Sequence, residues 1–241
     1  MTVVLIGRIE DLPENILGLP KGAREYILSA SSAAVRRERY SAYRLLSALI
    51  RRCFSADVGE LTLMREGDRP YLTRNVERVP FDFNLSHSGD FVCAALTDRG
   101  QIGVDIEKKI TEERAERLEK RFSLSKRISG AEVRIIDPYS AMFPPDCVPP
   151  STGEKICKAE LCRENFLFGF ELDGEKERKA DTETLSFTER WTVCESALKR
   201  DGRGMSGVGS LAEVLSSCSV YTFSFTDGGC EYSLAVSATK D

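Results

Sequence analysis

Two neighbouring segments organise this chain: they read Phe83-Asn84-Leu85-Ser86-His87-Ser88-Gly89-Asp90 and Ile102-Gly103-Val104-Asp105-Ile106-Glu107. The first holds the only histidine among 241 residues. The second reads as a strand, and because a strand projects residues i and i+2 to one side, Asp105 and Glu107 share a face. Two carboxylates on one face repel each other unless a cation lies between them, and an oxygen-only pair suits Mg²⁺, which completes its shell with water and substrate phosphates. The segment therefore indicates a substrate that carries phosphate.

Composition and charge bound the class of protein. Hydrophobic residues make up 41% and charged residues 30% of the chain, as in ordinary globular proteins, and the length allows one large domain or two of about 120 residues. The net charge of -4 gives no general attraction to nucleic acid or to an anionic membrane, so we expect neither as a partner. Residues 1–8 lack the basic start of a targeting segment, and no apolar run approaches roughly 18 residues, so we expect a cytoplasmic protein.

Eight cysteines at irregular spacing are expected to be reduced thiols. Cys157 and Cys162 form a single C-x4-C pair with no partner pair and no nearby histidine, so we do not expect a zinc site.

Hydrophobic periodicity predicts both strands and helices. Strands are expected at residues 1–8, 60–65, 81–86, 91–97, 102–106, 221–225 and 232–238, a turn at 67–71, and helices at 31–53, 111–122 and 187–200. The helix at 31–53 is rich in arginine, and most of these side chains fit a solvated face. Arg44 is the exception, because it lies beside the apolar Leu45 and Leu46 and reaches toward a groove between elements.

The chain reads as two similar halves, 1–101 and 102–241. Each opens on an apolar strand followed by helical sequence, and residues 91–98 close the first half much as 232–239 close the second, which hints at duplication. Residues 124–184 carry five prolines and a charged run and read as an insertion, in part a mobile loop with a hairpin. This predicts an α+β fold with a ligand cleft between the halves.

Two further features are weak when taken alone. Glu195 and Lys199 are four residues apart on the helix at 187–200, which by itself is an ordinary surface ion pair. Ser86, His87 and Ser88 are adjacent, so their side chains diverge and do not form a local nucleophile–base pair. A hydrolase triad is therefore the minor interpretation.

In combination, these segments resemble a known family. Asn84-Leu85-Ser86-His87-Ser88, Gly103-Val104-Asp105-Ile106-Glu107 and Trp191-Thr192-Val193-Cys194-Glu195-Ser196-Ala197-Leu198-Lys199 are similar, in this order, to the three signature motifs of the surfactin-type (Sfp-like) 4′-phosphopantetheinyl transferases. Gly67-Asp68-Arg69-Pro70 resembles the family's Gly-Lys-Pro element, and Arg44-Leu45-Leu46 resembles its helical arginine element. The resemblance covers most of the chain apart from the insertion.

The resemblance implies a fold and an activity. The fold is two similar α/β halves in a pseudo-twofold arrangement, here with an insertion in the second half. The activity is that of a Mg²⁺-dependent holo-[acyl-carrier-protein] synthase, which transfers 4′-phosphopantetheine from coenzyme A to a serine of an apo acyl or peptidyl carrier protein and releases 3′,5′-ADP. A monomer is expected, and the carrier would dock near residues 111–122 and the start of the insertion.

The resemblance also assigns residues. Mg²⁺ would be held by Asp105, Glu107 and Glu195, the catalytic residues would be Glu195, Lys199 and Asp105, and coenzyme A would be bound by Arg44, Arg69, Pro70, Ser86, His87 and Lys199. Ser86, His87 and Lys199 would contact phosphates, Arg44 the 3′-phosphate, and Arg69 with Pro70 the adenine region. Either Glu195 or a water on the metal would take the proton of the carrier serine.

Departures from the family pattern leave alternatives open. Cys194 stands where the family usually has lysine, and the link between the second and third motifs is longer by the insertion. A non-catalytic scaffold that binds coenzyme A or another nucleotide is the main alternative. A Mg²⁺-dependent phosphohydrolase is the third hypothesis.

Overall fold

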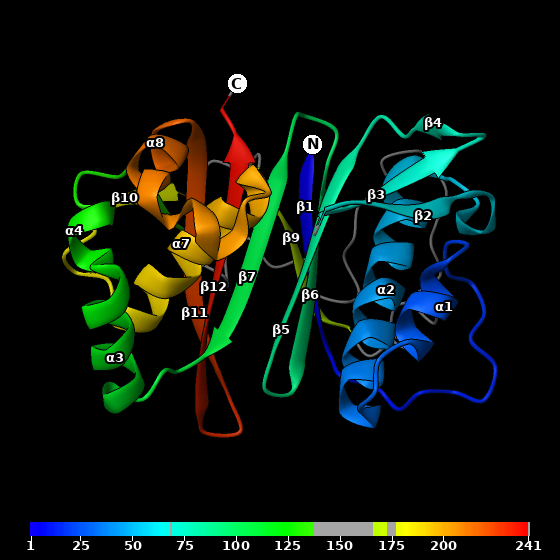
Figure 1. The fold of residues 1–241 in the computed structure, drawn as a ribbon, viewed down its shortest axis with the longest axis horizontal. Helices are drawn as coiled ribbons and strands as arrows, with labels where there is room; N and C mark the ends of the chain where they lie inside the picture. Colours follow the sequence, from blue (N-terminus) through cyan, green and yellow to red (C-terminus); the bar gives the residue numbers. More distant parts are fainter. Residues whose placement is uncertain (68, 137–165, 173–176, 241) are drawn as a thin grey trace.

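The computed structural model describes residues 1–67, 69–136, 166–172 and 177–240 (Figure 1). It confirms a mixed α+β protein, and the described strands form three sheets. The first sheet has the order β5 (Asp82–Ser88), β6 (Phe91–Thr97), β1 (Thr2–Arg8) and β9 (Phe166–Glu171). The second has the order β10 (Glu177–Ala180), β8 (Val133–Ile136), β11 (Cys218–Asp227), β12 (Cys230–Thr239) and β7 (Ile102–Lys108). The small third sheet contains β2 (Thr62–Glu66), β3 (Arg69–Arg74) and β4 (Glu77–Arg78).

Helices cover the outer faces of the two larger sheets (Figure 1). Within the described ranges the helices are α1 (Ala23–Leu28), α2 (Ala33–Phe54), α3 (Glu112–Phe122), α4 (Leu124–Ile128), α7 (Phe187–Asp201) and α8 (Leu211–Ser216), with 3-10 turns at Val58–Glu60 and Gly204–Ser210. The expected helices at 31–53, 111–122 and 187–200 are thus confirmed as α2, α3 and α7. None of the helices in the described ranges is long and apolar enough to cross a membrane.

Strand alternation separates three apolar clusters. On β1, Val4 and Ile6 point to a core shared by the two sheets, where they join Val104 and Ile106 of β7. The opposite face of the first sheet packs on α2, and the opposite face of the second sheet packs on α7, α4 and α8. The molecule is therefore layered as helix, sheet, sheet and helix.

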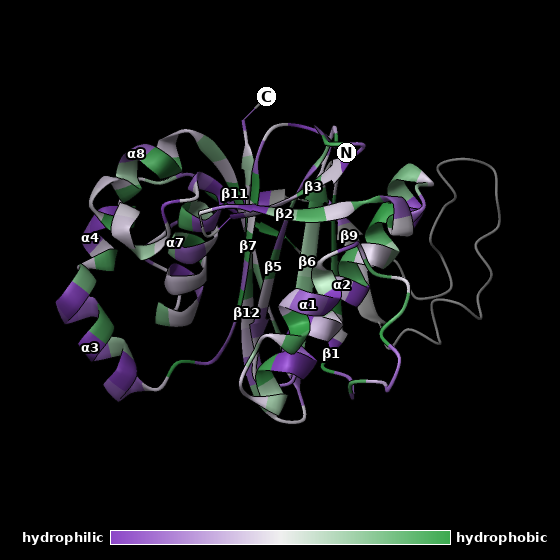
Figure 2. Ribbon diagram, turned by 45° about the vertical axis from the view of Figure 1, so that its right-hand side comes forward, coloured by the Kyte–Doolittle hydropathy of each residue, from purple (hydrophilic) through white to green (hydrophobic). Residues whose placement is uncertain are grey.

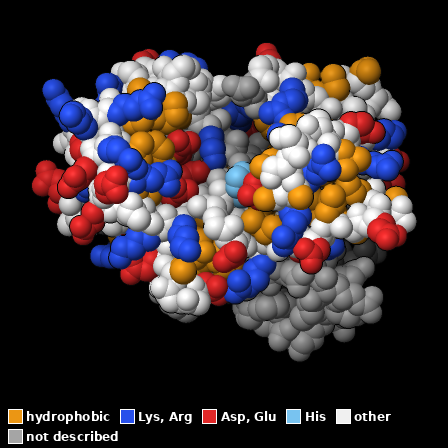
Figure 3. Space-filling view, turned by 60° about the horizontal axis from the view of Figure 1, so that its bottom comes forward, with side chains coloured by type: hydrophobic (Ala, Val, Ile, Leu, Met, Phe, Trp, Pro, Cys, Tyr) orange, Lys and Arg blue, Asp and Glu red, His pale blue; other side chains and the backbone are white. Residues whose placement is uncertain are grey.

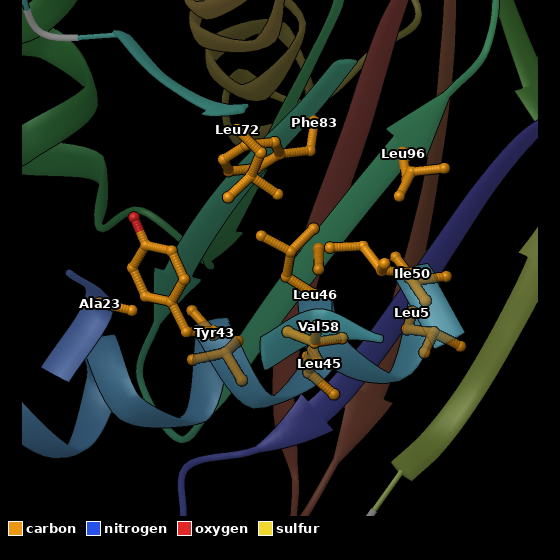
Figure 4. Packing of buried hydrophobic residues seen from close by; sticks show 14 of the residues in the cluster. Leu5, Ala23, Tyr43, Leu45, Leu46, Ile50, Val58, Leu72, Phe83 and Leu96 are labelled. Atoms are coloured by element: carbon orange, nitrogen blue, oxygen red, sulfur yellow. The ribbon is translucent and has the colours of Figure 1, made fainter. Parts of the chain in front are cut away.

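The core under α2 joins this helix to the first sheet (Figure 4). Tyr43, Leu46 and Ile50 lie on one face of this helix and pack against Leu5 of β1 and Phe83 of β5. All five are at most 5% exposed. Each such side chain contributes about 1.5–3 kcal/mol of transfer free energy when it leaves water, which is why the apolar stripe of an arginine-rich helix faces inward.

The predicted halves, 1–101 and 102–241, each contain three strands in the same order. β1 opens the first half and pairs antiparallel with β6, which pairs with β5. β7 opens the second half and pairs antiparallel with β12, which pairs with β11. The two segments that look alike in sequence, 91–98 and 232–239, thus supply β6 and β12, the middle members of two equivalent three-stranded units.

Residues 124–184, expected to be an insertion with a mobile loop and a hairpin, contain strands that join both large sheets, and β8 and β10 pair antiparallel as in a hairpin. β8 pairs in parallel with β11, and β9 pairs with β1 of the first sheet. The apolar run at 166–172 completes an otherwise open edge of the first sheet, and such edge pairing depends on contacts distant in sequence.

Residues 137–165, with Cys157 and Cys162, lie outside the described residues. The cysteines inside the described ranges are free thiols: Cys53, Cys93, Cys194, Cys218 and Cys230.

The turn expected at 67–71 is shorter in the structure, because Arg69 and Pro70 already belong to β3. Pro70 faces Arg65 of β2, while β4 reaches only Thr73 and Arg74. The missing N–H of the proline therefore interrupts no pairing with β4, and a proline at the open end of a strand is tolerated.

Candidate functional site

A row of polar side chains on β5 joins the two large sheets. β5 and β7 are edge strands of different sheets, so the outward N–H groups of β7 have no strand partner on that side. These N–H groups donate instead to side chains of β5. The four bonds run from Ile102 to Asp82 Oδ2 (2.9 Å), from Val104 to Asn84 Oδ1 (3.1 Å), from Ile106 to Ser86 Oγ (3.3 Å) and from Lys108 to Ser88 Oγ (3.0 Å). We call this row the polar ladder, and it fixes β7 beside β5.

The helix that carries Glu195 and Lys199 packs directly on β7, and a glycine makes this possible. A Cβ atom on Gly103 would lie 2.0 Å from the carbonyl oxygen of Ser196 and 2.5 Å from the backbone nitrogen of Arg200. Only a residue without a side chain fits between a strand and helix backbone this close. Helix α7 begins at a capping box, in which Ser186 and Glu189 bond each other's backbone, so the register of its site residues is defined from its first turn.

Three predicted site residues from three separate segments meet at one point. The Lys199 ammonium donates to Asp105 Oδ1 (2.7 Å) and to Ser86 Oγ (2.9 Å), and the Ser86 hydroxyl donates to the same Asp105 oxygen (2.9 Å). Asp105 and Ser86 are buried. Burial works to lower the pKa of Lys199, but the charge and hydrogen bond of Asp105 outweigh it, so that the pKa is raised and the ammonium is retained.

The second carboxylate of β7 lies at the more open side of this cluster. Ser88 donates to Glu107 Oε2 (2.9 Å), and the guanidinium of Arg114, on α3, lies 2.8 Å from Glu107 Oε1. The Glu107 side chain is 15% exposed and that of Arg114 is 48% exposed, so the pair lies at the boundary between the protein and solvent. Glu107 therefore has one partner inside the protein, Ser88, and one partner exposed to solvent, Arg114.

Glu195 is electrostatically coupled to both carboxylates of β7. Burial raises its pKa, the charge of Asp105 raises it further, Lys199 lowers it, and Glu107 raises it. This coupling indicates that three acidic groups from β7 and α7 act on one another. A partly buried carboxyl with a raised pKa is a common feature of functional sites.

The chemistry of these donors fits a hard divalent cation, because all three are carboxylates. Among the residues that the structure describes, however, no group of three His, Cys, Asp or Glu side chains is arranged to hold a metal ion. Cationic side chains lie on two of the carboxylates instead, Lys199 on Asp105 and Arg114 on Glu107. The Mg²⁺ site therefore stays a prediction. The three carboxylates suit the ion chemically, but they are not arranged around one common point in the described residues.

Two other predicted residues, His87 and Arg44, lie on the α2 side of the first sheet. His87 and Ser86 are adjacent on β5 and point to opposite faces, and His87 Nδ1 lies 3.6 Å from Glu38 Oε2 on α2. The histidine is the pale-blue residue at the edge of a hollow in Figure 3. Arg44 pairs with Glu10 (3.2 Å) and is 27% exposed. The structure thus does not bring Arg44 and His87 into direct contact with the carboxylate cluster.

Arg69 lies inside the protein, at the end of α7. Its guanidinium donates to the carbonyl oxygens of Lys199 (2.9 Å), Arg200 and Ile102 (3.2 Å) and to Asp82 of the polar ladder. Its side chain is 11% exposed. Arg69 therefore ties the last turn of α7 to both large sheets, and the adenine contact expected of Arg69 and Pro70 stays a prediction.

Cys194, which departs from the family pattern, lies in the protein core. Its side chain is 2% exposed and belongs to the apolar cluster between α7 and the second sheet. Burial in this cluster raises the pKa of the thiol well above its ordinary value. Position 194 thus faces the core, whereas Glu195 is only partly buried.

Sequence reasoning missed three participants: Ser88 and Arg114, which bind Glu107, and Asp82, which anchors Arg69. The alternation of polar with apolar residues along β5 carried a signal for two of them, because 82, 84, 86 and 88 share one face. No local signal identified Arg114.

No protein-family model matches the chain, and no curated protein matches it.

Proposed function

We propose that this protein is a 4′-phosphopantetheinyl transferase that moves phosphopantetheine from coenzyme A to a serine of an apo acyl or peptidyl carrier protein. The observation that carries the proposal is the contact among Ser86, Asp105 and Lys199, which come from the three motif segments and share two oxygen atoms. Motif residues separated by up to 113 positions thus contact one another, which supports the proposal. The pseudo-twofold fold of the family is part of the proposal, and the repeated order β5-β6-β1 and β11-β12-β7 supports it.

The proposed reaction is a single displacement at phosphorus. The carrier serine oxygen forms a bond to the phosphorus next to the pantetheine arm, the bond from that phosphorus to the bridging oxygen breaks, and 3′,5′-ADP leaves. The serine proton goes to Glu195 or to a bound water, the two acceptors that the motif leaves open; burial and the charge of Asp105 raise the pKa of Glu195 in the protein without metal. Mg²⁺, when bound, supplies charge stabilisation of the diphosphate.

The remaining residues would bind and orient. Asp105, Glu107 and Glu195 would hold the cation, and Lys199 would move from Asp105 toward phosphate oxygens as a flexible point charge. Arg44 and His87 would extend the anion site along α2, with Arg69 and Pro70 toward adenine. The charged helix α3, which contacts Glu107 through Arg114, is the surface that we propose for the carrier protein (Figure 2).

The test incubates the purified chain with coenzyme A, Mg²⁺ and a panel of apo carrier proteins from fatty-acid, polyketide and peptide synthases. Intact mass spectrometry should show the addition of one phosphopantetheine to at least one carrier. Glu107→Ala should abolish the addition. Glu60→Ala is the matched control, because Glu60 lies in the 3-10 turn Val58–Glu60, outside α3 and the candidate site, with 55% of its side chain exposed in a surface pair with Arg74.

Each outcome decides between the hypotheses. Full activity of Glu107→Ala would remove the role of the carboxylate pair. Tight binding of coenzyme A without transfer to any carrier would favour the non-catalytic scaffold. Release of phosphate from small substrates without a carrier would favour the phosphohydrolase.

A further inference from the structure

Ser86 and Ser88 differ from the other members of the polar ladder. Asp82 and Asn84 accept bonds from β7 backbone N–H groups but contact no carboxylate of the candidate site. Each serine also accepts a hydrogen bond from a β7 N–H group, that of Ile106 or Lys108. In addition, each serine donates its hydroxyl hydrogen to the carboxylate one residue before that N–H group. Ser86 donates to Asp105 and Ser88 donates to Glu107, both over 2.9 Å.

The hydrogen-bonding capacity of Ser86 is fully used in this arrangement. A hydroxyl has one donor hydrogen and two acceptor lone pairs. The hydrogen of Ser86 goes to Asp105, while the lone pairs accept from Lys199 (2.9 Å) and from the N–H of Ile106 (3.3 Å). Ser86 is also buried. Its hydroxyl thus has no hydrogen left to donate to a phosphate oxygen.

The spacing of the two serines matches that of the two acids. Residues 86 and 88 lie on one face of β5, and residues 105 and 107 lie on one face of β7. Because each serine is fixed by a backbone N–H group of β7, its hydroxyl defines where the adjacent carboxylate oxygen rests. The two strands therefore present two carboxylates in one repeated geometry.

We propose that Ser86 and Ser88 are positioning residues that orient Asp105 and Glu107 toward a shared divalent cation, rather than contacts to the phosphates of coenzyme A. This inference rests on the proposed function. Groups that hydrogen-bond to metal-ligating side chains set ligand orientation, and their loss commonly weakens metal affinity about 10–100-fold. Since both serines act through carboxylates, their removal should weaken cation binding more than it weakens coenzyme A binding.

The test measures Mn²⁺ affinity by electron paramagnetic resonance on the full chain, in parallel with thermal unfolding and coenzyme A affinity. Ser88→Ala should weaken Mn²⁺ binding about tenfold, while coenzyme A affinity without metal is unchanged. Ser88→Thr keeps a hydroxyl at this half-buried position and should restore the Mn²⁺ affinity. Asn84→Ala is the control for loss of a ladder bond, because Asn84 holds Val104 and contacts no carboxylate. It should lower the unfolding temperature and leave Mn²⁺ affinity unchanged.

Equal Mn²⁺ affinity in the wild-type protein and Ser88→Ala would overturn the inference and leave the proposed function standing. A loss of coenzyme A affinity without metal in Ser88→Ala would also overturn it, because it would make Ser88 a substrate contact. A wild-type chain that binds no Mn²⁺ would overturn both the inference and the metal-dependent function.

Discussion

Replacement of Gly103 by alanine tests how the site is assembled. Real Cβ atoms essentially never come within 3.0 Å of another heavy atom, whereas a Cβ at this position would lie 2.0 Å from the Ser196 carbonyl oxygen. Both close atoms belong to the backbone of α7, so no side chain can turn away. The helix must therefore move outward from β7 by about 1 Å, the shortfall between these two distances.

The effect on stability follows from that movement. Overpacking in a well-packed contact costs about 1–3 kcal/mol. A displacement of this size also stretches the bond of 2.7 Å between Lys199 and Asp105, and it loosens the bonds that Arg69 makes to the last carbonyls of α7. We expect the free energy of unfolding of Gly103→Ala to fall by about 3 kcal/mol in total, which lowers the unfolding temperature by roughly 6–12 °C for a chain of this length.

Differential scanning calorimetry of Gly103→Ala and of a matched control measures this loss. Gly209→Ala is the control, because a Cβ on Gly209 meets nothing within 4 Å and its φ is not in the left-handed region. Its stability should change by no more than about 0.5–1 kcal/mol. If Gly103→Ala unfolds within 2 °C of the wild type while Gly209→Ala behaves as expected, the close approach of α7 to β7 is not what holds the site together.

Three further substitutions probe the charges of the site. Glu195→Gln removes a carboxyl whose pKa is raised in the folded state, so it should stabilise the fold by about 1 kcal/mol, or 2–4 °C, at pH 8 and abolish transfer. Because a raised folded pKa makes stability fall as pH rises above the unfolded value of about 4.3, this gain should vanish at pH 4. Arg114→Ala removes the cation beside Glu107 and should tighten Mn²⁺ binding several-fold in paramagnetic resonance titrations. Arg69→Met leaves three carbonyl oxygens without the guanidinium donor and Asp82 without its cationic partner, and it should lower the free energy of unfolding by about 3–5 kcal/mol in urea titrations.

Each of these results has a clear opposite. A Glu195→Gln protein that is less stable than the wild type at pH 8 would show that the carboxylate is a favourable structural charge. Weaker Mn²⁺ binding in Arg114→Ala would make the arginine a support of Glu107 rather than its competitor. An Arg69→Met protein of normal stability would show that the internal bonds of Arg69 contribute little.

Much of the local structure could be predicted because it depends on patterns a few residues long. The period of two placed β5, β6 and β7, and it put Asp105 and Glu107 on one face. The period of 3.6 placed α2 and α7. The position of β9 in the first sheet could not be predicted in this way, because β9 gains its place by pairing with β1 more than 150 residues away.

The sequence by itself determined which residues carry oxygen and nitrogen groups suited to phosphate chemistry, since motif spacing and side-chain chemistry are local properties. Only the tertiary structure decided which of these groups meet. It joined Ser86, Asp105 and Lys199, assigned Ser88 and Arg114 to Glu107, and turned His87 toward α2. The physical reason is that β5 and β7 lie at the edges of different sheets, so their contact follows from sheet packing and from the close approach of α7 at Gly103.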